Sequence, residues 1–118
     1  MAAAVTYDLT HGIATLTLNR SDSKNSLSAE LMDALGDNFT KAINDPGVRV
    51  IMLTNNGNTF CAGANLKDPN ASEVPRYSLV EIFNLMQSSP KPIVGRIAGH
   101  CMGGGVGLAA ACDISIAA

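Results

Sequence analysis

Charged residues are scarce in this sequence. Aspartate, glutamate, lysine and arginine make up 15% of the 118 residues, and the net charge at pH 7 is −2. A protein that binds nucleic acid usually gathers lysine and arginine on one surface, so this balance argues against a nucleic-acid partner. Long apolar runs are lacking too, and none approaches the ~18–20 residues that a membrane span needs. Because the first residues also lack the basic region of a secretory signal, we expect no membrane partner and a cytoplasmic location.

Cysteine is rare and irregularly spaced. The sequence contains Cys61, Cys101 and Cys112, an odd number with no C-x-x-C pair. Disulfide frameworks and zinc sites both depend on paired or closely spaced cysteines. The sequence therefore predicts reduced thiols in the core and no metal site.

The common phosphate-binding and hydrolase motifs are also lacking. The run Gly103-Gly104-Gly105-Val106-Gly107 reads G-x-G-x-G, which differs from the G-x-G-x-x-G of dinucleotide-binding folds, and no G-K-[ST] is present. No G-x-S-x-G elbow occurs, which argues against an acyl hydrolase. His11 and His100 are isolated in the sequence, so we expect them to be structural or solvated.

What the sequence does contain is an alternation of strand-like and helix-like segments. Residues 5–9 and 13–18 alternate apolar and polar side chains around Thr10-His11-Gly12, which predicts a β-hairpin. Further strands are expected over residues 48–53, 93–98 and 112–116, the first of them buried on both faces. Helices are expected from a Ser28 cap to Ile43, over 62–76, from Leu79 to Met86 and over 106–111. This order in 118 residues predicts one α/β domain.

Two nearly bare segments follow predicted strands. These are Phe60-Cys61-Ala62-Gly63-Ala64 and Gly103-Gly104-Gly105. Without side chains, both segments can present backbone N–H groups directly to a ligand. Two such groups aimed at one point can stabilise an oxygen that becomes negative during a reaction, although glycine-rich turns also serve plain packing.

Three blocks of sequence together resemble the enoyl-CoA hydratase/isomerase (crotonase) family. They are Leu18-Asn19-Arg20-Ser21-Asp22-Ser23-Lys24-Asn25-Ser26-Leu27-Ser28, then Phe60-Cys61-Ala62-Gly63-Ala64-Asn65-Leu66-Lys67, and finally Lys91-Pro92-Ile93-Val94 with Gly103-Gly104-Gly105 leading to Ala111-Cys112-Asp113. The resemblance implies a crotonase-like (ClpP/crotonase) ββα spiral, assembled as homotrimers or hexamers. It also implies an acyl-CoA thioester as partner, with coenzyme A as part of the substrate and no permanently bound cofactor.

The resemblance also assigns roles to residues. The backbone N–H groups of Ala64 and Gly104 would form the oxyanion hole that stabilises a thioester enolate. The residues that would line the acyl-CoA site are Lys24, Asn25, Ser26, Ala62, Gly63, Leu66, Gly103 and Gly105. Because the sequence ends on a predicted strand, we expect residues 1–118 to be the N-terminal portion of a single crotonase-type domain, completed elsewhere.

One departure from the family bears on the reaction. In the family's hydratases a glutamate follows the glycine triplet, and Gly107 occupies that position here, while the second glutamate belongs to a segment beyond residue 118. We expect an enoyl-CoA hydratase when complete, and no activity from residues 1–118 alone. Alternatives are an isomerase, a decarboxylase or thioester hydrolase of the same family, or a catalytically silent acyl-CoA-binding or subunit-interaction protein. Asp113, after the last helix, is expected to support a turn.

Overall fold

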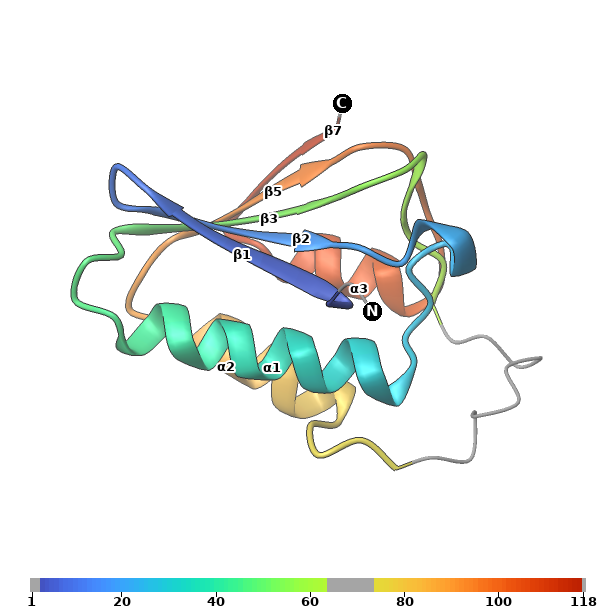
Figure 1. Cartoon of the computed structure of the whole chain (residues 1–118), viewed down its shortest axis with the longest axis horizontal. Helices are drawn as coiled ribbons and strands as arrows, with labels where there is room; N and C mark the ends of the chain where they lie inside the picture. The colour runs from blue at the N-terminus through green and yellow to red at the C-terminus, as the bar shows by residue number, and fades with distance from the viewer. Residues whose placement is uncertain (1–2, 64–73, 118) are drawn as a thin grey trace.

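A computed structural model describes residues 3–63 and 74–117 of the chain (Figure 1). The strands are β1 (Val5–Thr10), β2 (Ile13–Leu18), β3 (Val50–Asn55), β4 (Thr59–Cys61), β5 (Ile93–Ile97), β6 (His100–Cys101) and β7 (Ile114–Ala117). The helices are α1 (Ala29–Asn44), α2 (Leu79–Ser88) and α3 (Gly104–Ala111), preceded by a 3-10 turn, η1 (Ser21–Ser23). The family's α/β fold class is therefore the one observed.

The five longer strands form one sheet in the order β1-β2-β3-β5-β7. The hairpin β1-β2 is antiparallel, and every later neighbour is parallel. After β2 the chain always steps in the same direction across the sheet. Because parallel crossovers are right-handed, successive steps in one direction put all their helices on the same face. Figure 1 shows α1, α2 and α3 together below the sheet. This is one side of a spiral built from strand and helix units.

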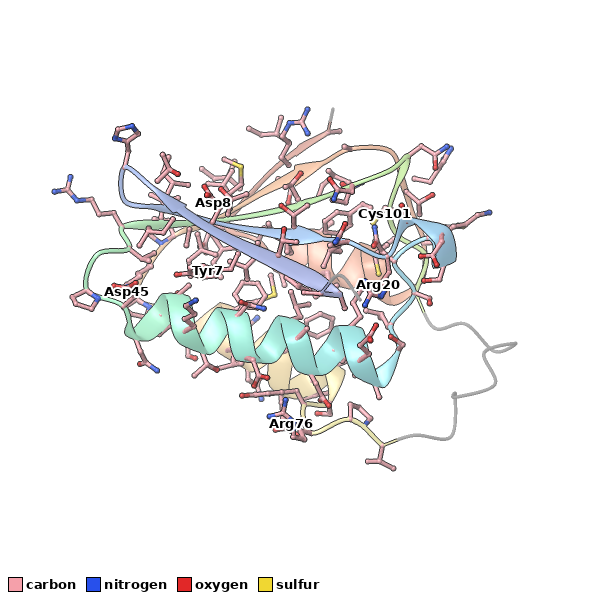
Figure 2. The ribbon with its side chains drawn as sticks, viewed as in Figure 1. Tyr7, Asp8, Arg20, Asp45, Arg76 and Cys101 are labelled. Atoms are coloured by element: carbon pink, nitrogen blue, oxygen red, sulfur yellow. The ribbon has the colours of Figure 1, made fainter. Side chains whose placement is uncertain are left out.

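The core lies between the sheet and the three helices. Leu31, Leu35 and Phe39 recur at four-residue spacing on α1 and have no exposed surface. Tyr7 of β1 also faces α1 (Figure 2). Nζ of Lys41, on α1, is 4.1 Å from the centre of the Tyr7 ring. The packing fixes α1 along the hairpin end of the sheet.

Several predicted elements are confirmed. The hairpin, the helix that begins after Ser28 and the helix that begins at Leu79 are all present. Ser28 caps α1 as expected, since its Oγ accepts a hydrogen bond of 3.1 Å from the Leu31 N–H. The last helix begins earlier than predicted, inside the glycine run at Gly104.

Other boundaries and burial patterns were predicted wrongly. The strand expected over 48–53 begins at Val50. Val48 and Arg49 belong to the turn after α1, since the Val48 N–H donates to Asp45 O and the Arg49 N–H donates to Gly12 O. Its burial alternates between buried and half-buried, so the prediction of two buried faces is wrong. The last strand likewise begins at Ile114, since Cys112 is the C-cap of α3. Of the helix expected over 62–76, residues 64–73 lie outside the described residues, and the described ends are not helical.

A second, two-stranded sheet was not predicted. In it, β4 and β6 pair in parallel, with Thr59 opposite His100 and Cys61 opposite Cys101. These strands are three and two residues long, which is too short for a periodic signal. The small sheet is what brings the two glycine-bearing segments of the sequence together.

Candidate functional site

Three separate segments meet at the end of the small sheet. The loop of residues 24–27 pairs with the end of β4, since the Ala62 N–H donates to Lys24 O at 3.0 Å and the Leu27 N–H donates to Gly63 O at 2.9 Å. On the other side of β4, the Met102 N–H donates to Cys61 O at 3.0 Å. Residues 61–63 are therefore held between the 24–27 loop and the glycine run.

Gly63 and the glycine run touch through their main chains. A Cβ built on Gly63 would lie 3.0 Å from Met102 O and 3.1 Å from Gly104 N, closer than side chains normally approach. Gly63 has φ +81° and Gly103 has φ +55°, backbone conformations that glycine adopts readily. The close approach and the positive φ both favour glycine at position 63, whereas at position 103 the positive φ alone does.

The Gly104 N–H lies at the N-terminus of α3. Gly104 is the first residue of α3, and the next two N–H groups donate to Met102 O at 2.9 Å and Gly103 O at 3.0 Å. The Gly104 N–H itself has no backbone hydrogen-bond partner among residues 3–63 and 74–117. The first N–H groups of a helix lack partners within the helix, and the helix dipole is positive there. An oxygen that gains negative charge would be stabilised at this point.

Ala64 and Leu66 cannot be placed relative to this group, because both lie outside the described residues. The expected convergence of the Ala64 and Gly104 N–H groups therefore stays a prediction. The described neighbour Gly63 brings the chain to within contact of Gly104 immediately before Ala64.

Asn25 was expected to line the ligand site, and the structure gives it a different position. Its side chain has no exposed surface, so it cannot contact a ligand. Its Oδ1 accepts from the Arg20 N–H at 2.7 Å, and its Nδ2 donates to Thr59 O at 3.0 Å and to Asn56 O at 3.4 Å. A buried amide with these partners holds the loop to the start of β4. Asn25 is therefore a positioning residue.

The neighbours of Asn25 divide between surface and interior. Lys24 is exposed, with φ +56°, and contributes its carbonyl to the pairing with Ala62. Ser26 is 5% exposed. Figure 2 shows Arg20, which precedes this loop, at the same end of the sheet as Cys101. Of the three predicted loop residues, Lys24 alone presents an exposed side chain.

Two further glycines serve close packing. A Cβ on Gly105 would lie 2.3 Å from Cys61 O, so this glycine lets α3 rest directly on β4. A Cβ on Gly107 would lie 2.7 Å from Cζ of Phe83. The position expected to lack an acid is therefore covered by the ring of Phe83, a contact between helices that the sequence alone gave no signal for.

Three titratable groups, Cys61, Glu81 and Asp113, have structural surroundings or roles. Burial raises the pKa of the Cys61 thiol to about 11, so it stays protonated near neutral pH. Glu81 completes a capping box with Ser78 at the start of α2. Asp113 accepts from the Ile93 N–H at 2.7 Å, and its own N–H donates to Ile93 O at 2.8 Å. The turn-supporting role predicted for Asp113 is confirmed.

Within the ranges 3–63 and 74–117, two kinds of site are not found. No group of three histidine, cysteine, aspartate or glutamate side chains lies close enough together to hold a metal ion. No helix in this part of the chain has both the length and the apolar character to cross a membrane.

Comparisons with known proteins give one consistent family. The family model described as Enoyl-CoA hydratase/isomerase matches residues 8–118. The protein named "Probable enoyl-CoA hydratase echA6" of Mycobacterium tuberculosis is 38% identical over 107 residues, which cover 90% of this chain and 43% of that protein.

Solved structures of similar fold agree. An enoyl-CoA hydratase of Mycobacterium smegmatis superposes with a TM-score of 0.86 at 32% identity, covering 97% of this chain and 47% of that one. A probable enoyl-CoA hydratase of Mycobacterium thermoresistibile gives 0.83 at 34% identity, covering 97% and 49%. The chain spans about half the length of these relatives.

Proposed function

Since this chain belongs to the enoyl-CoA hydratase/isomerase family, we propose that it binds an acyl-CoA thioester with the thioester oxygen at the Gly104 N–H. The observation that carries the proposal is the contact between Gly63 and the start of α3, where the Gly104 N–H has no backbone partner among the described residues. A thioester carbonyl that becomes an enolate gains negative charge on its oxygen. Donors already aimed at that oxygen lower the barrier.

The second donor in this proposal is the Ala64 N–H. Gly63 stands one residue before it and already contacts Gly104, which supports the pairing. The Gly104 and Ala64 N–H groups would bind the oxygen, and the exposed Lys24 would meet a phosphate of coenzyme A. Assembly as a trimer or hexamer and a cytoplasmic location stay predictions.

The reaction proposed first is hydration of an enoyl-CoA. Adding water across the double bond requires a group that exchanges a proton beside the substrate. Position 107 supplies none, because it is a glycine covered by Phe83. In this proposal the acid comes from outside residues 1–118, and residues 1–118 alone are inactive. Isomerisation or another enolate reaction would need the same two N–H groups.

A second candidate is an acyl-CoA-binding protein without hydratase activity. The observation that favours it is the Phe83 ring over Gly107, which makes this side of the site apolar. Such a protein would still bind the thioester oxygen. It would differ from a hydratase in leaving the double bond unchanged.

The test compares two variants at Gly104 in the full-length protein. Gly104→Ala adds a Cβ that presses on Leu27 Cδ1 but keeps the N–H. Gly104→Pro adds a Cβ at the same place, closes the pyrrolidine ring on the nitrogen and so removes the N–H, and proline is tolerated at the first position of a helix. Hydration of crotonyl-CoA is followed as loss of the conjugated-thioester absorbance. Gly104→Pro should turn over roughly 10²–10³-fold more slowly than Gly104→Ala.

The outcomes separate the candidates. Equal turnover of the two folded variants would show that the Gly104 N–H does not act on the substrate. Binding of crotonyl-CoA by the unaltered protein without turnover would reject hydration and leave the binding protein or another enolate reaction. Absence of both binding and turnover would reject the proposed function.

A further inference from the structure

Three apolar side chains border the glycine face of α3. Gly104 and Gly107 are three residues apart, which puts them one above the other on the same face of the helix. A Cβ on Gly104 would lie 2.6 Å from Leu27 Cδ1 and 3.2 Å from Leu79 Cδ2, and a Cβ on Gly107 would meet Phe83 Cζ. The surface beside the Gly104 N–H is therefore hydrocarbon, contributed by the 24–27 loop and by α2.

The two side chains from α2 are held firmly in place. Leu79 and Phe83 are four residues apart and so share one face of the helix. Between and beyond them, Ile82 and Met86 are 0% and 2% exposed and fix α2 in the core. The capping box of Ser78 fixes its first turn. The position of α2, from which Leu79 and Phe83 project, is thus set by the fold.

These side chains are not sealed in the core. Leu27, Leu79 and Phe83 are each half-buried, whereas their neighbours on the core side are fully buried. An apolar surface that remains partly open beside a backbone N–H suits a ligand with a carbonyl oxygen and an adjoining hydrocarbon chain. The acyl group of a thioester has that form.

We propose that Phe83 limits the size of the acyl group that binds beside Gly104. The inference rests on the proposed function and names the feature that selects among its substrates. With the thioester oxygen at the Gly104 N–H, the acyl carbons lie against Leu27, Leu79 and Phe83, the side chains that already cover the glycine face of α3. The Phe83 ring over Gly107 bounds this space one helical turn further on, so short acyl groups fit and longer ones do not.

The ring could instead serve packing between α2 and α3 alone. The two roles predict different results, because loss of packing lowers stability for every ligand equally. A limit on acyl size instead changes the affinity for long acyl-CoAs relative to the affinity for short ones. The ratio of affinities for a short and a long acyl-CoA therefore separates the two roles.

The experiment measures dissociation constants of butanoyl-CoA and octanoyl-CoA by calorimetry on the full-length protein. Phe83→Ala should shift the ratio of the two constants at least about tenfold in favour of octanoyl-CoA, since a pocket discriminates about 10–200-fold per missing or extra methylene. Val80→Ala is the matched control, because Val80 lies on the same helix and is 65% exposed. It should leave the ratio unchanged.

Should Phe83→Ala not fold, Phe83→Leu keeps a smaller side chain at the position and should shift the ratio in the same direction by less. An unchanged ratio in a folded Phe83 variant, or an equal shift in Val80→Ala, overturns the size limit while leaving acyl-CoA binding intact. If the unaltered protein binds neither ligand, the proposed function itself fails.

Discussion

Gly63 and Gly104 lie next to each other although they are far apart in the sequence, and a Cβ on Gly63 would lie 3.1 Å from the Gly104 nitrogen, tighter than an ordinary contact. The pairing of β4 with β6 produces this approach, because Cys61 lies opposite Cys101 just before the two glycines. The β4–β6 pair thus positions the site, and the absence of side chains on Gly63 and Gly104 allows the two segments to come close.

The first prediction concerns Gly63 and a glycine of matched conformation. Gly12 also has φ +81°, but a Cβ there would lie 3.4 Å from the Arg49 side chain, an ordinary contact. Gly12→Ala should cost about 1–2 kcal/mol of unfolding free energy from backbone strain alone. Gly63→Ala should cost more and should also weaken binding of acyl-CoA, as urea denaturation and calorimetry would measure. Equal costs with unchanged binding would show that the contact with Gly104 does not matter.

The second prediction concerns the buried amide of Asn25. Asn25→Ala leaves the Arg20 N–H and Thr59 O without their side-chain partner, and should lower the unfolding free energy by at least about 2 kcal/mol. Asn25→Asp replaces the donor with a buried carboxylate oxygen that faces Thr59 O, so it should lower the unfolding free energy at least as much as Asn25→Ala. Asn38→Ala, which removes a bond to Ala34 O within α1, should change stability by about 0.5 kcal/mol or less. An effect of Asn25→Ala as small as this control would contradict the positioning role.

The third prediction concerns the C-terminus of α1. Nζ of Lys91 donates to Ala42 O at 2.7 Å and also to Asp45 O, which places a positive charge at the negative end of the α1 dipole. Lys91→Met should cost about 1–3 kcal/mol and increase amide exchange in the last turn of α1. Lys41→Met, which removes the contact with the Tyr7 ring and an exposed charge in the last turn of α1 but no hydrogen bond to its carbonyls, should cost about 1 kcal/mol or less. Unchanged exchange at the end of α1 in Lys91→Met would reject the capping role.

The fourth prediction concerns stability at high pH. Burial raises the pKa of Cys61 from its ordinary 9.0 to about 11 in the folded protein. Between these values the unfolded chain binds fewer protons than the folded one, so the unfolding free energy falls as pH rises. The contribution is intact below pH 9, declines by about 1.4 kcal/mol per pH unit and is lost by about pH 11.

The measurement for this fourth prediction is urea unfolding from pH 7 to 11. Cys61→Ala should flatten the decline, whereas Cys101→Ala, which removes a half-exposed thiol, should flatten it less. A decline of the same slope in Cys61→Ala would assign the pH dependence to other groups.

The elements with a long periodic pattern could be predicted from the sequence. The hairpin follows from alternation over six-residue strands, and α1 follows from Ser28 with Leu31 and Leu35 at helical spacing. The family could also be recognised, because each of its blocks is a run of consecutive residues that can be read directly from the sequence. The hairpin, α1 and the family blocks could be predicted because each depends on residues within one short stretch of sequence.

The geometry of the site could not be predicted in the same way. The pairing of β4 with β6 involves too few residues to show a period, and the burial of Asn25 depends on partners in two other segments. The ring of Phe83 over Gly107 is a contact between two helices, and nothing in either helix specifies the other. Contacts between distant segments decide these features.

The dependence of the site on glycine has a consequence for mutational scanning. Alanine scanning normally subtracts atoms and reports what a side chain contributes. At Gly63, Gly104 and Gly105 the same substitution adds a Cβ close to main-chain atoms or to Leu27, so it measures how well the surrounding atoms can move to accept that Cβ. A scan that omits glycines would pass over this part of the chain, and a deep substitution map would show it as the region where the smallest possible enlargement is harmful.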